Sequence, residues 1–146
     1  MKNLIEGVAN ATGTAEIQIE GQPDIRVDAM GIDFKKDEVQ VWFAEGVGGT
    51  MEPKQLFRMT LPIKSWIYNL DQLVADFIQY SDIYHFEYHP ESGGASIIVD
   101  KNLMTIKGSF NLQMKEAGGP HPGPPHPQPQ PKIIVHGFFD LKVGGE

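Results

Sequence analysis

Apolar and polar residues alternate with a period of two along most of the chain, a pattern that predicts a protein built mainly of β-strands. The segments 16–20 and 24–29 alternate in matching phase on either side of a Gly-Gln-Pro turn, so they predict a hairpin. The apolar positions change parity near 30–31, where one inserted residue would produce a β-bulge. Two further strands are predicted over 39–43 and 57–61.

The segment 69–80 departs from this alternation and predicts the only α-helix. Asn69 and Gln72 have the spacing of an N-cap residue and its N3 partner, and Asp71 lies in the first turn, where the helix dipole favours negative charge. Apolar residues then recur every three or four positions and form one stripe: Leu70, Leu73, Val74, Phe77 and Ile78.

The chain after this helix predicts a four-stranded antiparallel meander. Its strands are expected at 84–88, 95–99, 104–114 and 133–143, with turns at 89–94 and 100–103. A tract rich in Pro, Gly and His at 116–131 joins the last two strands, and this composition does not pair in a sheet. We expect a long solvated connection there, and the alternatives are a ligand for an SH3- or WW-type groove and a weak metal-binding tract.

The last two strands have sequences that predict their register. When Ile106 faces Leu141 in an antiparallel pair, Gly108 falls opposite Phe139 and Phe110 falls opposite Gly137. Each aromatic ring then covers the glycine of the neighbouring strand, as cross-strand pairing favours. The same register sets Lys107 against Asp140 on the other face, and a slip of one residue would lose all three matches.

The final strand is apolar on both faces between residues 133 and 139. Ile134 and Phe138 occupy positions that would face solvent in a one-sided sheet. A strand that is apolar on both sides is normally covered on both sides. The helix stripe is the cover that we expect, and a subunit interface is the alternative.

These elements predict a mainly β (α+β) fold of one domain, residues 1–146. The expected architecture is an antiparallel β-sandwich or flattened β-barrel of about eight strands, with the helix at about 69–80 between two four-strand groups. The tract at 116–131 is a loop inserted between the last two strands.

Composition and charge exclude several classes of function. The chain has no cysteine, so disulfides, thiolate metal sites and cysteine nucleophiles are ruled out. The net charge is −7, of which residues 1–52 carry −6, so no basic stripe is available for nucleic acid or for an anionic membrane surface. The N-terminus has no secretory apolar segment, and no run of 18 apolar residues occurs. We expect a soluble, cytoplasmic protein.

The sequence His85-x-Glu87-x-His89 is the strongest candidate for chemistry. Residues two apart in a strand project to the same side, and two imidazoles with a carboxylate can bind zinc or iron. Consecutive residues of one face lie almost 7 Å apart, however, so three ligands of one straight strand rarely reach one ion. Solvated side chains are therefore the simpler interpretation, and no cofactor other than a divalent metal at these residues is suggested.

Two tryptophans are candidate anchors for a partner. Trp42 alternates with core positions and should point outward, and Trp66 precedes the predicted helix. With Ile134 and Phe138 they favour a non-enzymatic binding or self-assembly module that acts through a sheet face or edge and its long loops, with a protein partner or a second copy. The alternatives are a carrier of a small hydrophobic ligand in a barrel cavity, and a metal-dependent enzyme that uses His85, Glu87 and His89.

Overall fold

The computed structural model describes residues 11–46, 55–63, 66–69, 74–81, 84–117 and 131–143. At 66–69, 80–81 and 84–85 it describes the backbone alone. These residues form nine antiparallel strands in a single sheet and contain no helix. No helix long and apolar enough to cross a lipid bilayer is therefore present in the described part of the chain.

For several strands the observed bounds are close to those predicted from the alternation of apolar and polar residues. They are β1 (Ala11–Ile19), β2 (Ala29–Phe34), β3 (Glu38–Glu45), β4 (Gln55–Pro62), β5 (Trp66–Asn69), β6 (Val74–Ser81), β7 (Tyr84–Asp100), β8 (Thr105–Glu116) and β9 (Lys132–Val143). Their spatial order is β1-β9-β8-β7-β6-β4-β3-β2, and β5 pairs with β7 outside this path.

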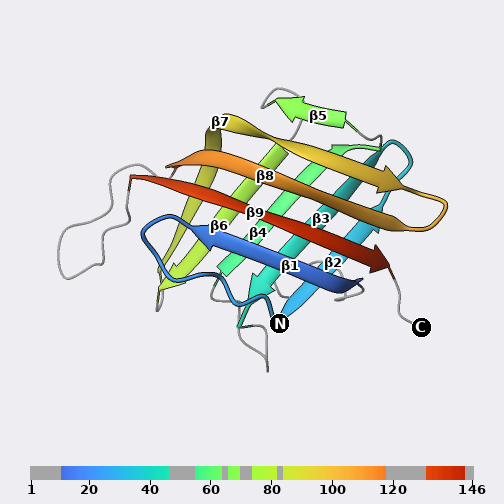
Figure 1. Cartoon of the computed structure of the whole chain (residues 1–146). Coiled ribbons are helices and arrows are strands. Elements are labelled where there is room, and N and C mark those ends of the chain that lie inside the picture. The colour runs from blue at the N-terminus through green and yellow to red at the C-terminus, as the bar shows by residue number, and fades with distance from the viewer. Residues whose placement is uncertain are drawn as a thin grey trace.

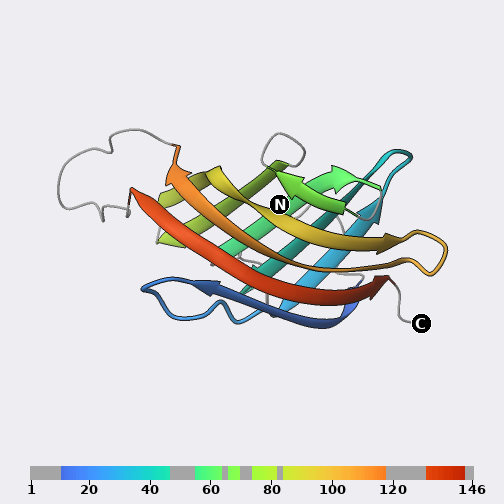
Figure 2. The same cartoon turned by 45° about the horizontal axis from the view of Figure 1, so that its top comes forward.

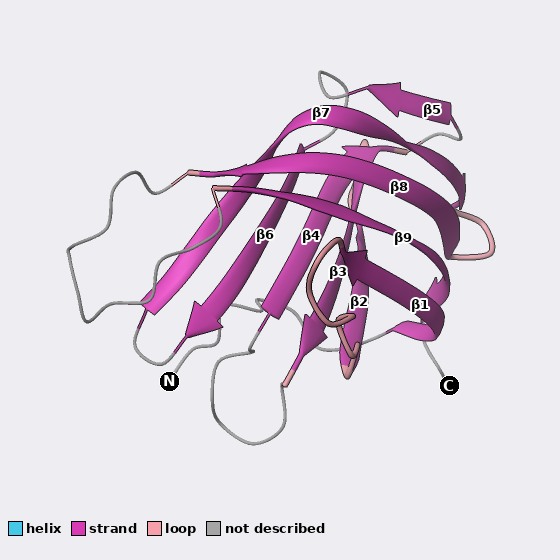
Figure 3. Cartoon of the chain, turned by 60° about the vertical axis from the view of Figure 1, so that its left-hand side comes forward, coloured by secondary structure: helices cyan, strands magenta, loops and turns pink. Residues whose placement is uncertain are grey.

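The sheet is rolled into a nearly closed, flattened barrel with two layers (Figure 1). The front layer contains β1, β9, β8 and the second half of β7, and the rear layer contains β6, β4, β3 and β2 (Figure 2). The long strand β7 bends from one layer into the other, as Figure 3 shows. At the opposite side the roll is closed by one isolated bridge, in which the Ile25 amide donates to the Ile17 carbonyl at 3.0 Å.

The predicted register of the last two strands is confirmed. Gly108 lies opposite Phe139 and Phe110 lies opposite Gly137, while Lys107 faces Asp140. Gly137 is required by the close approach of β1, because a Cβ there would lie 2.1 Å from the backbone oxygen of Glu16. The glycines therefore serve both the aromatic pairing and the spacing of neighbouring strands.

The core lies between the two layers and is built from aromatic rings. Phe43 of the rear layer contacts Phe139 of the front layer with ring centroids 5.3 Å apart. Phe57 stacks on Phe110 across the layers at 4.8 Å. These rings are almost fully buried, and they are joined by aliphatic residues that alternate along every strand. The alternation that predicted the strands therefore also predicted the core.

The predicted helix at 69–80 is wrong over 74–80, because these residues belong to β6, which pairs with β4 and β7. The helical stripe places Val74, Phe77 and Ile78 on one side. In the strand, Phe77 faces the core, Ile78 is buried on the opposite face, and Val74 is 67% exposed. A strand buried on both faces loses the period-two signal, and its β-branched and aromatic residues are the remaining cue.

The predicted turn at 89–94 is also wrong, because β7 continues through it. The register with β8 shifts between Pro90 and Ser92, which marks a bulge, and Gly93 has φ of +113°. Proline and glycine here bend one long strand instead of ending it, since bulges accommodate both residues. The expected four-stranded meander is therefore made of three long strands, β7, β8 and β9. The turn at 100–103 is confirmed, with the Leu103 amide donating to Asp100 Oδ1 at 3.0 Å.

The first hairpin and its bulge differ from expectation. Residues 26–28 form no strand, and only the Ile17–Ile25 bridge joins the two arms. The register of β2 with β3 runs unbroken from Ala29 to Phe34, so there is no bulge at 30–31. The change of parity in the sequence is absorbed by the irregular segment before β2.

Candidate functional site

The four predicted anchor residues have different environments. Trp42 points to the outer side of the rear layer as predicted, but it is only 6% exposed and its indole covers Gly31, where a Cβ would lie 2.4 Å from Nε1. The backbone of Trp66 pairs with Ile97, and its side chain lies outside the described residues. Ile134 is half-buried, and Phe138 is 50% exposed. Among the three whose side chains are described, Phe138 is therefore the most accessible.

Phe138 lies on the outer side of the front layer. The expected helix cover is absent from the described residues, so the outward side chains of β9 face away from the core with no second layer of described chain above them. We call the outward positions of β1, β9, β8 and the second half of β7 the front face. Its members are Thr12, Thr14, Glu16, Gln18, Lys132, Ile134, His136, Phe138, Asp140, Lys142, Thr105, Lys107, Ser109, Asn111, Gln113, Lys115, Ser92, Gly94, Ser96, Ile98 and Asp100.

The front face has a half-exposed aromatic ring, Phe138, beside a depression. Phe138 is register partner to Ser109, whose next neighbour across the sheet is Ser96. An open depression of about 330 Å³ lies next to this row and is lined by Ser96, Ile98, Lys107, Gly108, Ser109, Phe139 and Asp140. The small serines leave the space, while Ile98, 53% exposed, supplies an apolar wall.

The front face is nearly neutral although the chain is strongly acidic. It holds three acids and four lysines, a net charge of +1 against −7 for the whole chain. Lys107 lies opposite Asp140 in the register, and neither residue forms an ion pair with another described residue. Local neutrality matters because two acidic surfaces repel each other when they approach.

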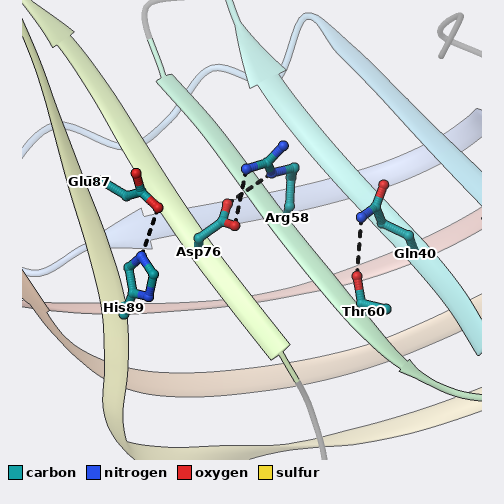
Figure 4. A network of polar contacts seen from close by, with 6 residues as sticks. All are labelled: Gln40, Arg58, Thr60, Asp76, Glu87 and His89. Atoms are coloured by element: carbon teal, nitrogen blue, oxygen red, sulfur yellow. Dashed lines mark hydrogen bonds and ion pairs between the residues drawn. The ribbon is translucent and has the colours of Figure 1, made fainter. Parts of the chain in front are cut away.

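The proposed metal ligands lie along the first half of β7. His89 Nε2 contacts Glu87 Oε2 at 2.7 Å, and both side chains are substantially exposed (Figure 4). His85 contributes only its backbone to the described residues. Within the described side chains no group of three ligands could hold a metal, and His89 faces Lys115 across the ladder. A metal site that includes His85 stays a prediction.

Figure 4 also shows the polar residues on the outer side of the rear layer. Arg58 donates two hydrogen bonds to Asp76, from Nε at 2.9 Å and from Nη2 at 3.1 Å. Gln40 Nε2 donates to Thr60 Oγ1 at 3.1 Å. These side chains are partly buried and bind one another, so they leave few polar groups free for a ligand.

A polar network at one end of the barrel is absent from the sequence predictions. Gln79 Nε2 donates to Gln22 Oε1 and to Gln55 Oε1, both at 2.9 Å, and Gln55 Nε2 donates to Glu45 at 3.2 Å. Gln55 and Gln79 lie two residues from the core residues Phe57 and Phe77 and therefore point to the same, inner side of the sheet. This spacing is the sequence signal that could have identified the network. The network ties the segment after β1 to β6 across this end.

One titratable group inside the barrel has a shifted pKa. Burial raises the pKa of the Tyr88 phenol from 10.0 to about 12, and the negative charge of Glu116 contributes in the same direction. The phenol is therefore neutral throughout the physiological range, and Tyr88 packs against Phe77 with ring centroids 6.1 Å apart. This residue belongs to the core and offers no acid–base chemistry near pH 7.

Comparison with protein-family models, with curated proteins and with solved structures gave no significant match. Of the surfaces described above, the front face is the one that combines exposed apolar residues, a depression and near-neutral charge.

Proposed function

We propose that this chain is a non-enzymatic module that self-associates through the front face. The observation that carries the proposal is the exposed Phe138 on the outward face of β9, where Ile134 is a second apolar residue. Exposed aromatic residues near the centre of a surface are typical anchors of protein interfaces. Ile98 lies on the same face, beside the depression, and adds apolar area.

The packed interior favours this proposal over a ligand carrier. A carrier needs a hollow barrel, whereas Phe43, Phe57, Phe110 and Phe139 contact one another between the layers. The glutamine side chains at one end already bind each other. Space for a hydrophobic ligand would therefore require displacement of core rings, which is costly.

The size of the front face sets the strength that we expect. β8 and β9 have 12 residues each, and strands of that length span about 40 Å, while four strands span about 19 Å. The projected area is roughly 700 Å², near the ~800 Å² that each partner contributes to a standard interface. Because the outer side of a rolled sheet is curved, only part of this area can touch a partner. We expect a weak complex, with a dissociation constant on the order of 10⁻⁴ M.

Light scattering and sedimentation over a range of protein concentrations test the proposal. We expect the average mass of the wild type to rise from 16.2 kDa toward twice that value as concentration increases. Phe138→Ser should remove this rise, and Ile98→Ser should reduce it, because each substitution removes exposed apolar surface without opening the core. The matched control is Leu103→Ser, since Leu103 is 64% exposed in the turn between β7 and β8.

The outcome is decisive in either direction. A wild type that remains a monomer at about 1 mM, ten times the expected dissociation constant, would overturn the proposal. An equal loss of association in Leu103→Ser and Phe138→Ser would also overturn it, because the effect would not be specific to the front face. Thermal unfolding of each variant checks that the fold is intact.

A further inference from the structure

We infer that the partner on the front face is a second copy related by a two-fold axis that runs between β8 and β9, parallel to the strands. The inference deepens the proposed function and rests on it. Two copies that meet face to face through a two-fold axis use the same patch, so each contact occurs twice. With the axis between β8 and β9, β8 of each copy lies over β9 of the other, within the angular scatter of packed sheets.

With this axis, residues that are register partners on β8 and β9 within one chain also face each other between the two copies. Any residue of β8 then lies opposite the copy of its own register partner on β9. Lys107 faces Asp140 of the second copy, and Ser109 faces Phe138 of the second copy, because these are the register pairs of the two strands. Facing sheets are about 10 Å apart, a distance that side chains of these lengths span together.

The shape of the front face fits this arrangement. Phe138 is half exposed on β9, and the depression extends beside it over β7, β8 and β9, with Ser96, Ser109 and Asp140 in its lining. Rotation about the proposed axis carries each Phe138 onto Ser109 of the other copy and so to the depression. Phe138 and the depression therefore meet twice in one dimer.

The charges fit it as well. Each copy brings one Lys107 and one Asp140 to the centre of the contact, and the two-fold places unlike charges opposite each other. Lys107 and Asp140 have no ion-pair partner among the described residues of their own chain. A pair formed between copies would be partly desolvated, where close opposite charges contribute more than on an open surface.

A two-fold axis across the strands gives a different set of contacts. If it passed through Phe138, the two Phe138 rings would stack and Lys107 would lie opposite Asn111. If it passed through Lys107 and Asp140, each of these residues would face the same residue of the second copy. Like charges would then meet, which is unfavourable. Only the axis along the strands makes association depend on the pairing of Lys107 with Asp140, so charge reversal separates these arrangements.

Mixing two oppositely substituted variants tests the inference. Lys107→Asp and Asp140→Lys copies should each self-associate at least about tenfold more weakly than the wild type, because like charges then meet twice. An equimolar mixture should recover association to within about threefold of the wild type, since the carboxylate introduced in one variant then faces the ammonium group introduced in the other. The two variants carry net charges of −9 and −5, so long-range attraction cannot account for recovery.

A matched pair of variants provides the control. Lys35 and Asp33 form an exposed ion pair at 3.9 Å near the end of β2, outside the front face. Lys35→Asp and Asp33→Lys give the same net charges of −9 and −5, and we expect wild-type association from each and from their mixture.

Each result decides the inference. Failure of the Lys107 and Asp140 variants to recover on mixing overturns the two-fold axis along the strands. If Phe138→Ser nevertheless abolishes association, self-association through the front face stands with another geometry. If the wild type does not associate, both fall. Equal weakening and recovery in the Lys35 and Asp33 controls would assign the effect to general electrostatics and overturn the inference.

Discussion

The outer sides of the two layers differ in how completely their side chains satisfy one another. On the rear side the aromatic residue Trp42 is buried over Gly31 and the doubly hydrogen-bonded ion pair of Arg58 with Asp76 is formed, although Val74 is 67% exposed there. On the front side, by contrast, the aromatic residue Phe138 is half exposed, and Lys107 and Asp140 form no ion pair with a described residue.

This difference indicates which surface is available for association. Buried aromatic rings and paired charges contribute to the stability of the chain itself, and their removal would destabilise it. Exposed aromatic rings and unpaired charges contribute little to folding, so they are free to contribute to binding. The two outer sides therefore predict opposite responses to the same kinds of substitution.

The largest contrast is expected between two aromatic residues. Trp42→Ala should destabilise the fold by about 3–5 kcal/mol, because it removes a large buried side chain. Phe138→Ala should cost less than about 1 kcal/mol, because half of its surface is already exposed. Urea unfolding at low protein concentration, where association is absent, measures both. Comparable losses for the two variants would contradict the distinction between the layers.

The next largest effect concerns the pH dependence of stability that is due to Tyr88, in the core between the two layers. The pKa of Tyr88 is raised from 10.0 to about 12 in the folded protein, so its contribution to stability is fully present below pH 10 and is lost as pH rises through 12. Tyr88→Phe lacks this dependence. The stability of the wild type relative to Tyr88→Phe should therefore fall by roughly 2–3 kcal/mol between pH 9 and pH 12. A difference that stays constant over this range would refute buried ionisation at Tyr88.

The smallest effect concerns charge pairs, measured at low protein concentration by double-mutant cycles. Substitution of Arg58 and Asp76 by alanine should give a coupling energy of about 0.5–1 kcal/mol, because the pair is partly exposed and screened by solvent. The same cycle on Lys107 and Asp140 should give a coupling near zero in the monomer, since these residues form no ion pair within the described chain. A larger coupling for Lys107 and Asp140 would reverse the expected order.

Much of the front layer could be predicted from the sequence because its signals are local and mutually consistent. In β8 and β9, each Phe of the core face has a Gly as its cross-strand partner, and the opposite charges of Lys107 and Asp140 agree with that register. The two Phe–Gly pairs select one pairing with which the charges are consistent, and a slip of one residue would lose these matches. The long alternation of both strands supplied the core positions at the same time.

The rear layer and the bend in β7 were harder to predict from the sequence, because their strands depart from period-two alternation of apolar and polar residues. β6 carries a buried apolar residue on each face, Phe77 inside and Ile78 outside, so its apolar residues gave a false helical spacing. In β7, Pro90 and Gly93 have the chemistry of a turn, yet the chain uses them for a bulge that carries the strand from one layer to the other. Tertiary packing decided both cases.

The candidate site was predictable only in part. The two-sided apolar pattern of the last strand identified Phe138 and Ile134, whereas the depression depends on how Ser96 of β7 and Ser109 of β8 are placed by the sheet. The burial of Trp42 depends on Gly31, which lies directly opposite it in the ladder of β2 and β3. Such contacts follow from strand pairing and are not readable from alternation.

The most direct test of the difference between the two layers is a dilution series followed by amide NMR. Between about 1 mM and about 20 μM, a range that brackets the expected dissociation constant, amides of Ser109, Phe138 and Asp140 should shift with concentration, while those of Arg58 and Asp76 should not. Constant spectra throughout the series, or shifts confined to the rear layer, would contradict the account.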